Sequence, residues 1–212
     1  AAIRCNGESN ARLDVVVRND MGNVSDGEFY TWSTGESGSA VKFIENLSEG
    51  SYSVSVRYNG ICEANASYSL LDPEPVTVTI AGNSNYNGQL ISCYNTTDAS
   101  LKISASGGGT GLSSSFSYTW STGATGTTIS GIGAGEYNVM ASDVNGCVGR
   151  DTFRIANPSP VEAFIFSASD FSGYGISCAG KNDGRITSGA SGGTNVFSYS
   201  WSDGKTTALI DN

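Results

Sequence analysis

Five cysteines are the residues of this sequence best placed to form a defined chemical structure, and they favour disulfide bonds. They are Cys5, Cys62, Cys93, Cys147 and Cys178. No two of them form a Cys-x-x-Cys pair and the chain has no histidine, so the usual spacings of zinc ligands and the commonest general base are both missing. Disulfides in turn indicate an oxidising, extracellular setting.

The spacing of the cysteines predicts two disulfides, Cys5 to Cys62 and Cys93 to Cys147. The separations of 57 and 54 residues agree, and each pair joins the start of one repeat to its last hairpin. Closing such a loop stabilises a domain by roughly 4 kcal/mol in the chain-entropy model. Pairing of Cys62 with Cys93 is the main alternative, and Cys178 is expected to be an unpaired thiol within residues 1–212.

Oxygen-bearing side chains at turns are candidate calcium ligands. They are Asp143, Asn145 and Asp183. Each cluster offers two or three side chains, whereas calcium takes six to eight oxygens. Asp and Asn are also favoured in turns for local hydrogen bonding alone. The sequence therefore predicts no cofactor and no metal, with calcium at these turns as the alternative.

No group of residues predicts catalysis. The chain lacks a Gly-x-Ser-x-Gly elbow and has only four scattered lysines, so no activated nucleophile can be assembled. Glycine-rich runs at residues 106–111 and 131–135 resemble phosphate-binding loops, but neither leads into a helix. We therefore expect a protein that is not an enzyme.

Composition and charge exclude two further classes of partner. The 212 residues include 20 acidic and 11 basic ones, a formal charge of -9, which opposes binding to a phosphate backbone. No apolar run approaches the roughly 18 to 20 residues that span a bilayer. Neither nucleic-acid binding nor membrane insertion is expected.

Two motifs recur with a common period and indicate three repeats. Tyr-x-Trp-Ser-x-Gly places Trp32, Trp120 and Trp201 at spacings of 88 and 81 residues, and an Ile-x-Cys triplet precedes each of them. Paired prolines near residues 73–75 and 158–160 mark the boundaries. The sequence predicts modules at residues 1–75, 76–160 and 161–212, the last truncated before its final two strands.

Apolar and polar residues alternate with a period of two, which predicts strands buried on one face. In the second module the expected strands lie near residues 76–82, 100–106, 116–121, 127–130, 136–142 and 147–156. Six or seven antiparallel strands in about 85 residues predict an all-β fold of tandem Ig-like sandwiches. The Cys-to-Trp spacing exceeds that expected in an antibody domain, which leaves the topology open. Short proline linkers predict a rod of stacked modules.

The three tryptophans have two interpretations. They could be platforms on which sugar rings stack, or core residues that fill the space between two sheets. Recurrence at one position of every repeat favours the core.

The motifs resemble the SprB repeat of gliding-motility adhesins from the Bacteroidetes. The third copy supplies Cys178, Asp183-Gly184, Gly192-Gly193-Thr194, Tyr199, Trp201-Ser202 and Gly204. The second supplies Gly108-Gly109-Thr110, Gly135-Glu136-Tyr137 and Asp143 to Cys147. The resemblance implies a segment of a very long cell-surface adhesin that is exported by the type IX system and moved by the gliding machinery. Thr152 lies in a sequence similar to Bacteroidetes O-glycosylation sites.

Three functional hypotheses follow. The first is a stretch of adhesin stalk whose partners are the neighbouring modules of the same chain. The second is a module that binds surface glycans or a polymer substratum through loop tyrosines such as Tyr86, Tyr94 and Tyr174. The third is an accessory domain of a secreted hydrolase.

Overall fold

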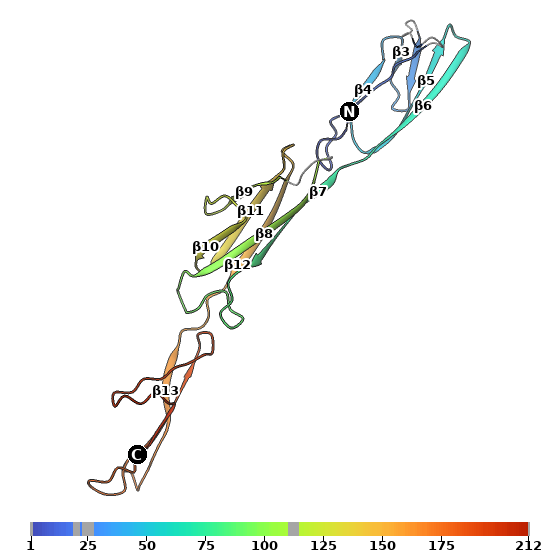
Figure 1. The fold of residues 1–212 in the computed structure, drawn as a ribbon. Helices are drawn as coiled ribbons and strands as arrows, with labels where there is room; N and C mark the ends of the chain where they lie inside the picture. Colours follow the sequence, from blue (N-terminus) through green and yellow to red (C-terminus); the bar gives the residue numbers. More distant parts are fainter. Residues whose placement is uncertain (1, 19–21, 23–27, 110–114, 212) are drawn as a thin grey trace. The chain divides into compact units, whose positions relative to one another are not determined.

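The computed structural model describes residues 2–18, 22, 28–109 and 115–211, and this part of the chain is all-β. Its strands are antiparallel, and none of the described residues is helical (Figure 1). No helix in this part is long and apolar enough to cross a membrane. Thr110, which belongs to one of the motifs above, lies outside the described residues.

Six strands form the predicted first module. They are β1 (Ala11–Asp14), β2 (Phe29–Trp32), β3 (Ser37–Gly38), β4 (Phe43–Leu47), β5 (Gly50–Tyr58) and β6 (Cys62–Leu70). One sheet pairs β1 with β4, and the other has the order β3-β2-β5-β6. Alternate residues of these strands are buried, including Tyr30, Trp32, Val54 and Val56, which join Ile3 in one hydrophobic core.

The predicted second module contains six strands in two three-stranded sheets, an Ig-like antiparallel β-sandwich. The strands are β7 (Glu74–Gly82), β8 (Ala99–Gly108), β9 (Ser117–Trp120), β10 (Thr128–Ile132), β11 (Gly135–Ser142) and β12 (Val148–Ile155). The sheet orders are β10-β8-β7 and β12-β11-β9. Leu101 and Ile129 are buried in the first of these sheets, and Trp120 and Val139 in the second, so each sheet has a buried face.

In the predicted third module the described residues form a single sheet. Its strands β13 (Glu162–Ala168), β14 (Arg185–Ser191) and β15 (Leu209–Asp211) pair in that order. No counterpart of the sheet β12-β11-β9 is present among the described residues of this module. Trp201 is accordingly only partly buried, and Phe164 is 47% exposed.

Grouped by proximity, the chain forms two compact units, each of which joins distant stretches of sequence. The first comprises residues 1–79, 104–125 and 139–151, and the second comprises residues 80–103, 126–138 and 152–212. The first unit therefore combines the predicted first module with part of the second. The boundaries predicted at residues 75/76 and 160/161 stay predictions.

Candidate functional site

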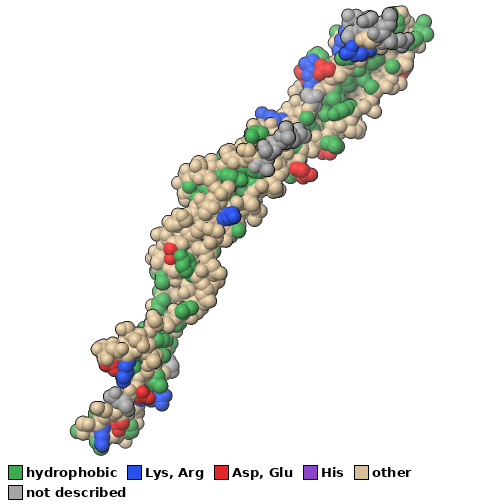
Figure 2. Space-filling view, viewed as in Figure 1, with side chains coloured by type: hydrophobic (Ala, Val, Ile, Leu, Met, Phe, Trp, Pro, Cys, Tyr) green, Lys and Arg blue, Asp and Glu red, His purple; other side chains and the backbone are tan. Residues whose placement is uncertain are grey.

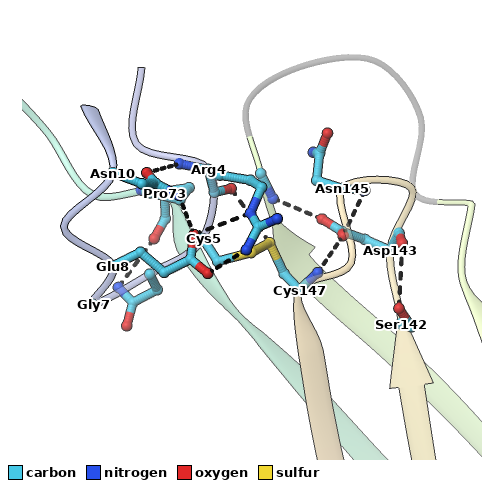
Figure 3. Close-up of a disulfide and its surroundings, with 12 residues drawn as sticks. Arg4, Cys5, Gly7, Glu8, Asn10, Pro73, Ser142, Asp143, Asn145 and Cys147 are labelled. Carbon is cyan, nitrogen blue, oxygen red and sulfur yellow. Dashed lines mark hydrogen bonds and ion pairs between the residues drawn. A yellow bond between two sulfur atoms is a disulfide. The ribbon is translucent and has the colours of Figure 1, made fainter. Parts of the chain in front are cut away.

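The most specific chemical feature of the structure is a disulfide between Cys5 and Cys147 (Figure 3). Their Cα atoms lie 5.4 Å apart although 142 positions separate them in the sequence. Cys62, Cys93 and Cys178 are free and exposed. The predicted pairs Cys5–Cys62 and Cys93–Cys147 are therefore wrong, as is the alternative Cys62–Cys93. The unpaired state expected for Cys178 stays a prediction.

The loop around Cys5 is anchored at the end of the first predicted module. Asn6 Nδ2 donates to the carbonyl oxygen of Pro73 at 3.1 Å, and the backbone N–H of Gly7 donates to the Asp72 carboxylate at 2.8 Å. These bonds hold Cys5 beside the segment that leaves β6.

The length of β6 explains why Cys62 cannot reach Cys5. Cys62 begins β6 at the hairpin, directly opposite Tyr58, and the strand runs from there to Leu70. Eight steps of extended chain span about 26 Å, at roughly 3.3 Å per residue. The Cα atoms of a disulfide must lie within about 7 Å. Cys62 and Cys5 are therefore at opposite ends of one strand.

The same geometry separates Cys93 from Cys147. The backbone N–H of Asn95 donates to the side-chain oxygen of Asn157 at 3.2 Å, which places the Cys93 loop beyond the end of β12. Cys147 immediately precedes the start of β12. The whole strand therefore lies between the two cysteines.

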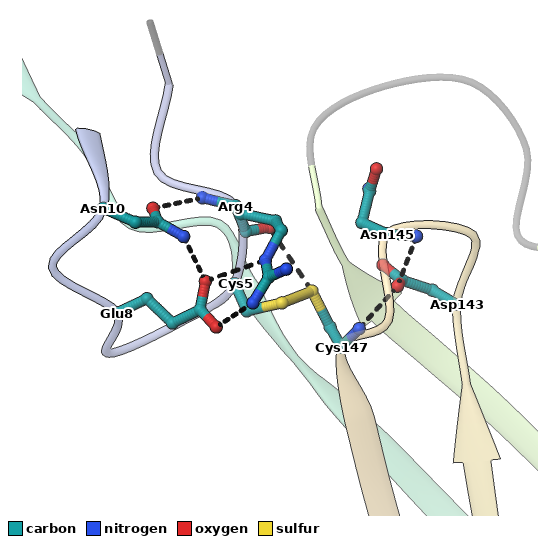
Figure 4. A network of polar contacts seen from close by, with 7 residues as sticks. All are labelled: Arg4, Cys5, Glu8, Asn10, Asp143, Asn145 and Cys147. Atoms are coloured by element: carbon teal, nitrogen blue, oxygen red, sulfur yellow. Dashed lines mark hydrogen bonds and ion pairs between the residues drawn. A yellow bond between two sulfur atoms is a disulfide. The ribbon is translucent and has the colours of Figure 1, made fainter. Parts of the chain in front are cut away.

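Asp143 organises the hairpin that presents Cys147 (Figure 4). Its Oδ1 accepts the backbone N–H groups of Asn145 at 2.9 Å and Cys147 at 2.8 Å. Its Oδ2 accepts the backbone N–H of Gly109 at 2.9 Å. Desolvation raises the pKa of Asp143, but the N–H donors of Gly109, Cys147 and Asn145 outweigh it and leave the pKa below its ordinary value of 3.8. The ionised carboxylate thus connects the glycine-rich loop at residues 107–109 to the hairpin at residues 143–147 that carries Cys147.

The backbone of Arg4 packs closely against this hairpin. Its carbonyl oxygen lies 3.3 Å from Cys147 Sγ, and a Cβ added to Gly109 would approach it to 2.9 Å. Only glycine therefore fits at position 109 without a shift of the backbone. The Arg4 guanidinium pairs with Glu8 at 2.7 Å on the surface, and this hydrogen bond lowers the pKa of Glu8.

This arrangement can act as a covalent clamp. The side chain of Cys147 is 6% exposed, Cys5 is partly buried, and each sulfur is held by a loop with its own hydrogen bonds. Accessible, activated cysteines are those used in redox catalysis, and buried ones are inert. The disulfide joins residues predicted to belong to two consecutive modules.

The tryptophans occupy one recurring turn. The backbone N–H of the tryptophan and that of the glycine three residues later make equivalent hydrogen bonds in all three copies. Trp32 and Trp120 lie in the core, at 5% and 2% exposure, and the Nε1 of Trp32 donates to the carbonyl of Val41 at 2.9 Å. In Trp201 the same atom donates to Thr207 at 2.8 Å. Neither core tryptophan presents a face to a sugar.

The three tyrosines proposed as a glycan surface do not share one position in the repeat. Tyr86 and Gln89 close one turn, and Phe171 and Tyr174 close the equivalent turn, so Tyr174 matches Gln89 rather than Tyr86. The Tyr86 hydroxyl donates to the backbone of its own module. Tyr94 and Tyr174 are exposed.

The calcium candidates already have protein partners. Asp183 accepts the backbone N–H of Ser177 at 3.0 Å and also its hydroxyl, while Asp143 holds the hairpin described above. Among the described residues no three His, Cys, Asp or Glu side chains gather as a metal site. Asn145 uses its backbone N–H in the same turn.

Thr152 lies exposed on β12, and its hydroxyl donates to Asn138 at 2.5 Å. O-glycosylation there stays a prediction. Sequence reasoning gave no signal for Glu28, which is fully buried and accepts the Tyr30 hydroxyl at 3.2 Å.

Charged side chains are sparse and scattered over the face drawn in Figure 2. This agrees with a charged fraction of only 15%. Among the described residues visible on that face, no concentrated patch of one sign offers a binding surface for a highly charged partner.

One family model matches part of the chain, and the other comparisons are weak or empty. No curated protein matches the chain. Solved structures similar to it include the amphioxus IgVJ-C2 molecule, at 17% identity over 72% of this chain and 98% of that one, with a TM-score of 0.28. Murine CEACAM1b is 10% identical over 60% of this chain and 84% of that one, with a TM-score of 0.23. Similarities this weak do not define the fold, which is assigned from the strands and sheets described above.

The SprB-repeat family model matches residues 176–206, which run from the Ile-x-Cys triplet to the turn after Trp201. The resemblance to this family that the motifs predicted is thereby confirmed, and the chain carries a SprB repeat at residues 176–206.

Proposed function

We propose that this chain is a segment of the stalk of a secreted cell-surface adhesin, and that its role is to carry tension without catalysing a reaction. The SprB repeat is an adhesin-type repeat of cell-surface proteins. Export by the type IX system and a place in gliding motility belong to the same proposal. So does a rod of stacked modules, which the short proline linkers favour.

The observation that carries the proposal is the Cys5–Cys147 disulfide. A pull applied to the two ends of the chain passes through the sulfur–sulfur bond and bypasses the residues between the cysteines. Those 142 sequence steps would otherwise extend by up to about 500 Å, at roughly 3.6 Å per residue. A covalent bypass of this length suits a stalk that must keep its length under load.

Single-molecule stretching of the chain from its termini tests this role. Without reductant, complete unfolding should release only the contour length of residues outside the disulfide loop. With a reductant such as dithiothreitol, each molecule should release about 500 Å more. Equal release in the two conditions would show that the disulfide does not bear the load.

The matched control is Cys62→Ser, which removes a free thiol and leaves the disulfide in place. This variant should stretch like the unmodified chain in both conditions. Cys147→Ser should behave as the reduced chain does, with or without reductant. Small-angle scattering tests the rod separately, because a compact globule of mutually packed modules would contradict it.

A further inference from the structure

The loop that carries Cys5 has two structural equivalents in the chain. We name them the cysteine loops, residues 3–10, 91–98 and 176–183. In each, the carbonyl oxygen of the cysteine accepts the backbone N–H three residues later, from Glu8, Thr96 and Lys181 at 3.1, 3.2 and 3.1 Å. The residue two positions after the cysteine has a left-handed φ in all three, at Gly7 (75°), Asn95 (60°) and Gly180 (75°).

A second hydrogen bond closes each cysteine loop. The backbone N–H just before the cysteine donates to the side-chain oxygen of the Asn or Asp five residues after it. The pairs are Arg4 to Asn10 (3.1 Å), Ser92 to Asp98 (3.1 Å) and Ser177 to Asp183 (3.0 Å). The three loops therefore share one backbone conformation, and in the first of them the cysteine is bonded to Cys147.

The first two cysteine loops are also anchored alike to the chain that leaves their module. The backbone N–H of Gly7 donates to the Asp72 carboxylate at 2.8 Å, and the backbone N–H of Asn95 donates to the side-chain oxygen of Asn157 at 3.2 Å. Each acceptor directly precedes a proline. The loops thus occupy the same place at the end of their modules.

The glycine-rich loop of the third module, residues 192–194, contacts the segment that precedes the Cys93 loop. Asn87 Nδ2 donates to the carbonyl oxygen of Thr194 at 2.6 Å, and the neighbouring Tyr86 hydroxyl reaches the backbone of Asp98 in the cysteine loop at 3.4 Å. In the second module the corresponding residue, Gly109, lies directly beside the Cys5 loop, because a Cβ added to it would approach the carbonyl oxygen of Arg4 to 2.9 Å.

The glycine-rich loops themselves are equivalent. A Cβ on Gly107 would collide with the carbonyl of Pro75, and one on Gly192 would collide with that of Pro160. The cysteine loop and its anchor at the end of the module, which form the first half of the clamp at Cys5, are therefore reproduced at Cys93. Its second half, a hairpin like that of Cys147, has no counterpart among the described residues 161–211.

We propose that Cys93 is a cross-linking site for a β-hairpin that presents a cysteine directly after Asn-Gly, as residues 145–147 do. This link would join the second module to the third, as the bond between Cys5 and Cys147 joins the first to the second. The link forms when two thiols lose two protons and two electrons to an oxidant such as glutathione disulfide, which is reduced to two thiols.

A loop transplant in the existing chain tests whether the Cys93 loop is competent. The triple variant Asn6→Tyr, Gly7→Asn, Glu8→Thr gives the Cys5 loop the sequence that follows Cys93. Non-reducing peptide mapping should still recover Cys5 bonded to Cys147 in the same yield. The control variant carries Val instead of Asn at position 7. Because Val is β-branched and resists the left-handed conformation, the yield of the bond between Cys5 and Cys147 should fall to a small fraction of that in the unmodified chain. Loss of the bond in the Asn variant as well would overturn the equivalence.

An extended chain tests the site itself. In this variant, a second copy of residues 132–160 is added after Asn212. The added copy continues the register of the repeat, because Ile210 pairs with Ile186 of β14 just as Ile129 pairs with Leu101 of β8. After oxidation with glutathione disulfide, mapping should recover Cys93 bonded to the added copy of Cys147. Cys93 returned as a free thiol, while the added segment resists proteolysis, would contradict the proposal. If the added segment is degraded by the protease, the loop transplant remains the test, and loss of the bond between Cys5 and Cys147 in the triple variant would overturn the proposal.

Discussion

The Asp143 carboxylate accepts the backbone N–H of Gly109 at 2.9 Å and so bridges two loops that lie 34 residues apart in the sequence. The same carboxylate fixes the turn that presents Cys147. One side chain therefore positions both the glycine-rich loop and the hairpin against the Cys5 loop.

Asp143→Asn should weaken this junction, because an amide keeps one acceptor oxygen and loses both the charge and the second acceptor. We expect a loss of about 1–2 kcal/mol in the free energy of unfolding, because part-buried backbone N–H groups lose hydrogen bonds to a charged acceptor. Urea unfolding at pH 7 measures it. Glu136→Gln, on the exposed face of β11, is the control and should leave the stability unchanged.

The pH dependence of this effect has a definite sign. Because the folded pKa of Asp143 lies below its ordinary value of 3.8, the carboxylate contributes its stability in full above that pH and loses it as the pH falls through the lower folded value. The stability difference between the unmodified chain and Asp143→Asn should therefore shrink below pH 3.8. A difference that grows on acidification would mean that the carboxylate is protonated more easily in the folded state.

Trp120→Ala should be far more destabilising than Trp201→Ala. Trp120 is 2% exposed and pairs with Val139 of β11, whereas Trp201 is only partly buried. Removing a buried tryptophan costs about 3–5 kcal/mol, and Trp201→Ala should cost a fraction of that. Chemical denaturation of both variants measures the difference. Equal losses would show that the third module has a closed core in solution.

The secondary structure of the second module was predictable from its sequence. Each of the six predicted strands is present, within two residues at either end, because alternation with a period of two marks the buried face and glycine-containing turns mark the ends. The motif of the third module also predicted the matching family correctly.

The disulfide was not predictable by the same reasoning. The spacing of two cysteines gives the length of the chain between them. It does not show at which end of a strand each cysteine lies. The nine-residue strand β6 carries the chain from Cys62 to the Asp72 region, where Cys5 is anchored. Nothing in the spacing of Cys5 and Cys147 indicates that the partner of a cysteine lies in the next repeat.

Cys147→Ser should lower the stability of the chain much more than Cys62→Ser. Closing a loop of 142 residues is worth about 5 kcal/mol in the chain-entropy model, and measured losses of native disulfides are about 2–5 kcal/mol. Cys62 is free and exposed, so its replacement should have little effect. Guanidinium unfolding without reductant compares the two, and a similar loss in both variants would count against the clamp.

Non-reducing peptide mapping of the oxidised, unmodified chain tests the bond between Cys5 and Cys147 without any substitution. The free thiols are first blocked with a maleimide, which should label Cys62, Cys93 and Cys178. Proteolysis and mass spectrometry should then recover one disulfide-linked pair, with Cys5 joined to Cys147. Recovery of Cys5 joined to Cys62, or of Cys93 joined to Cys147, would contradict a disulfide that spans consecutive modules.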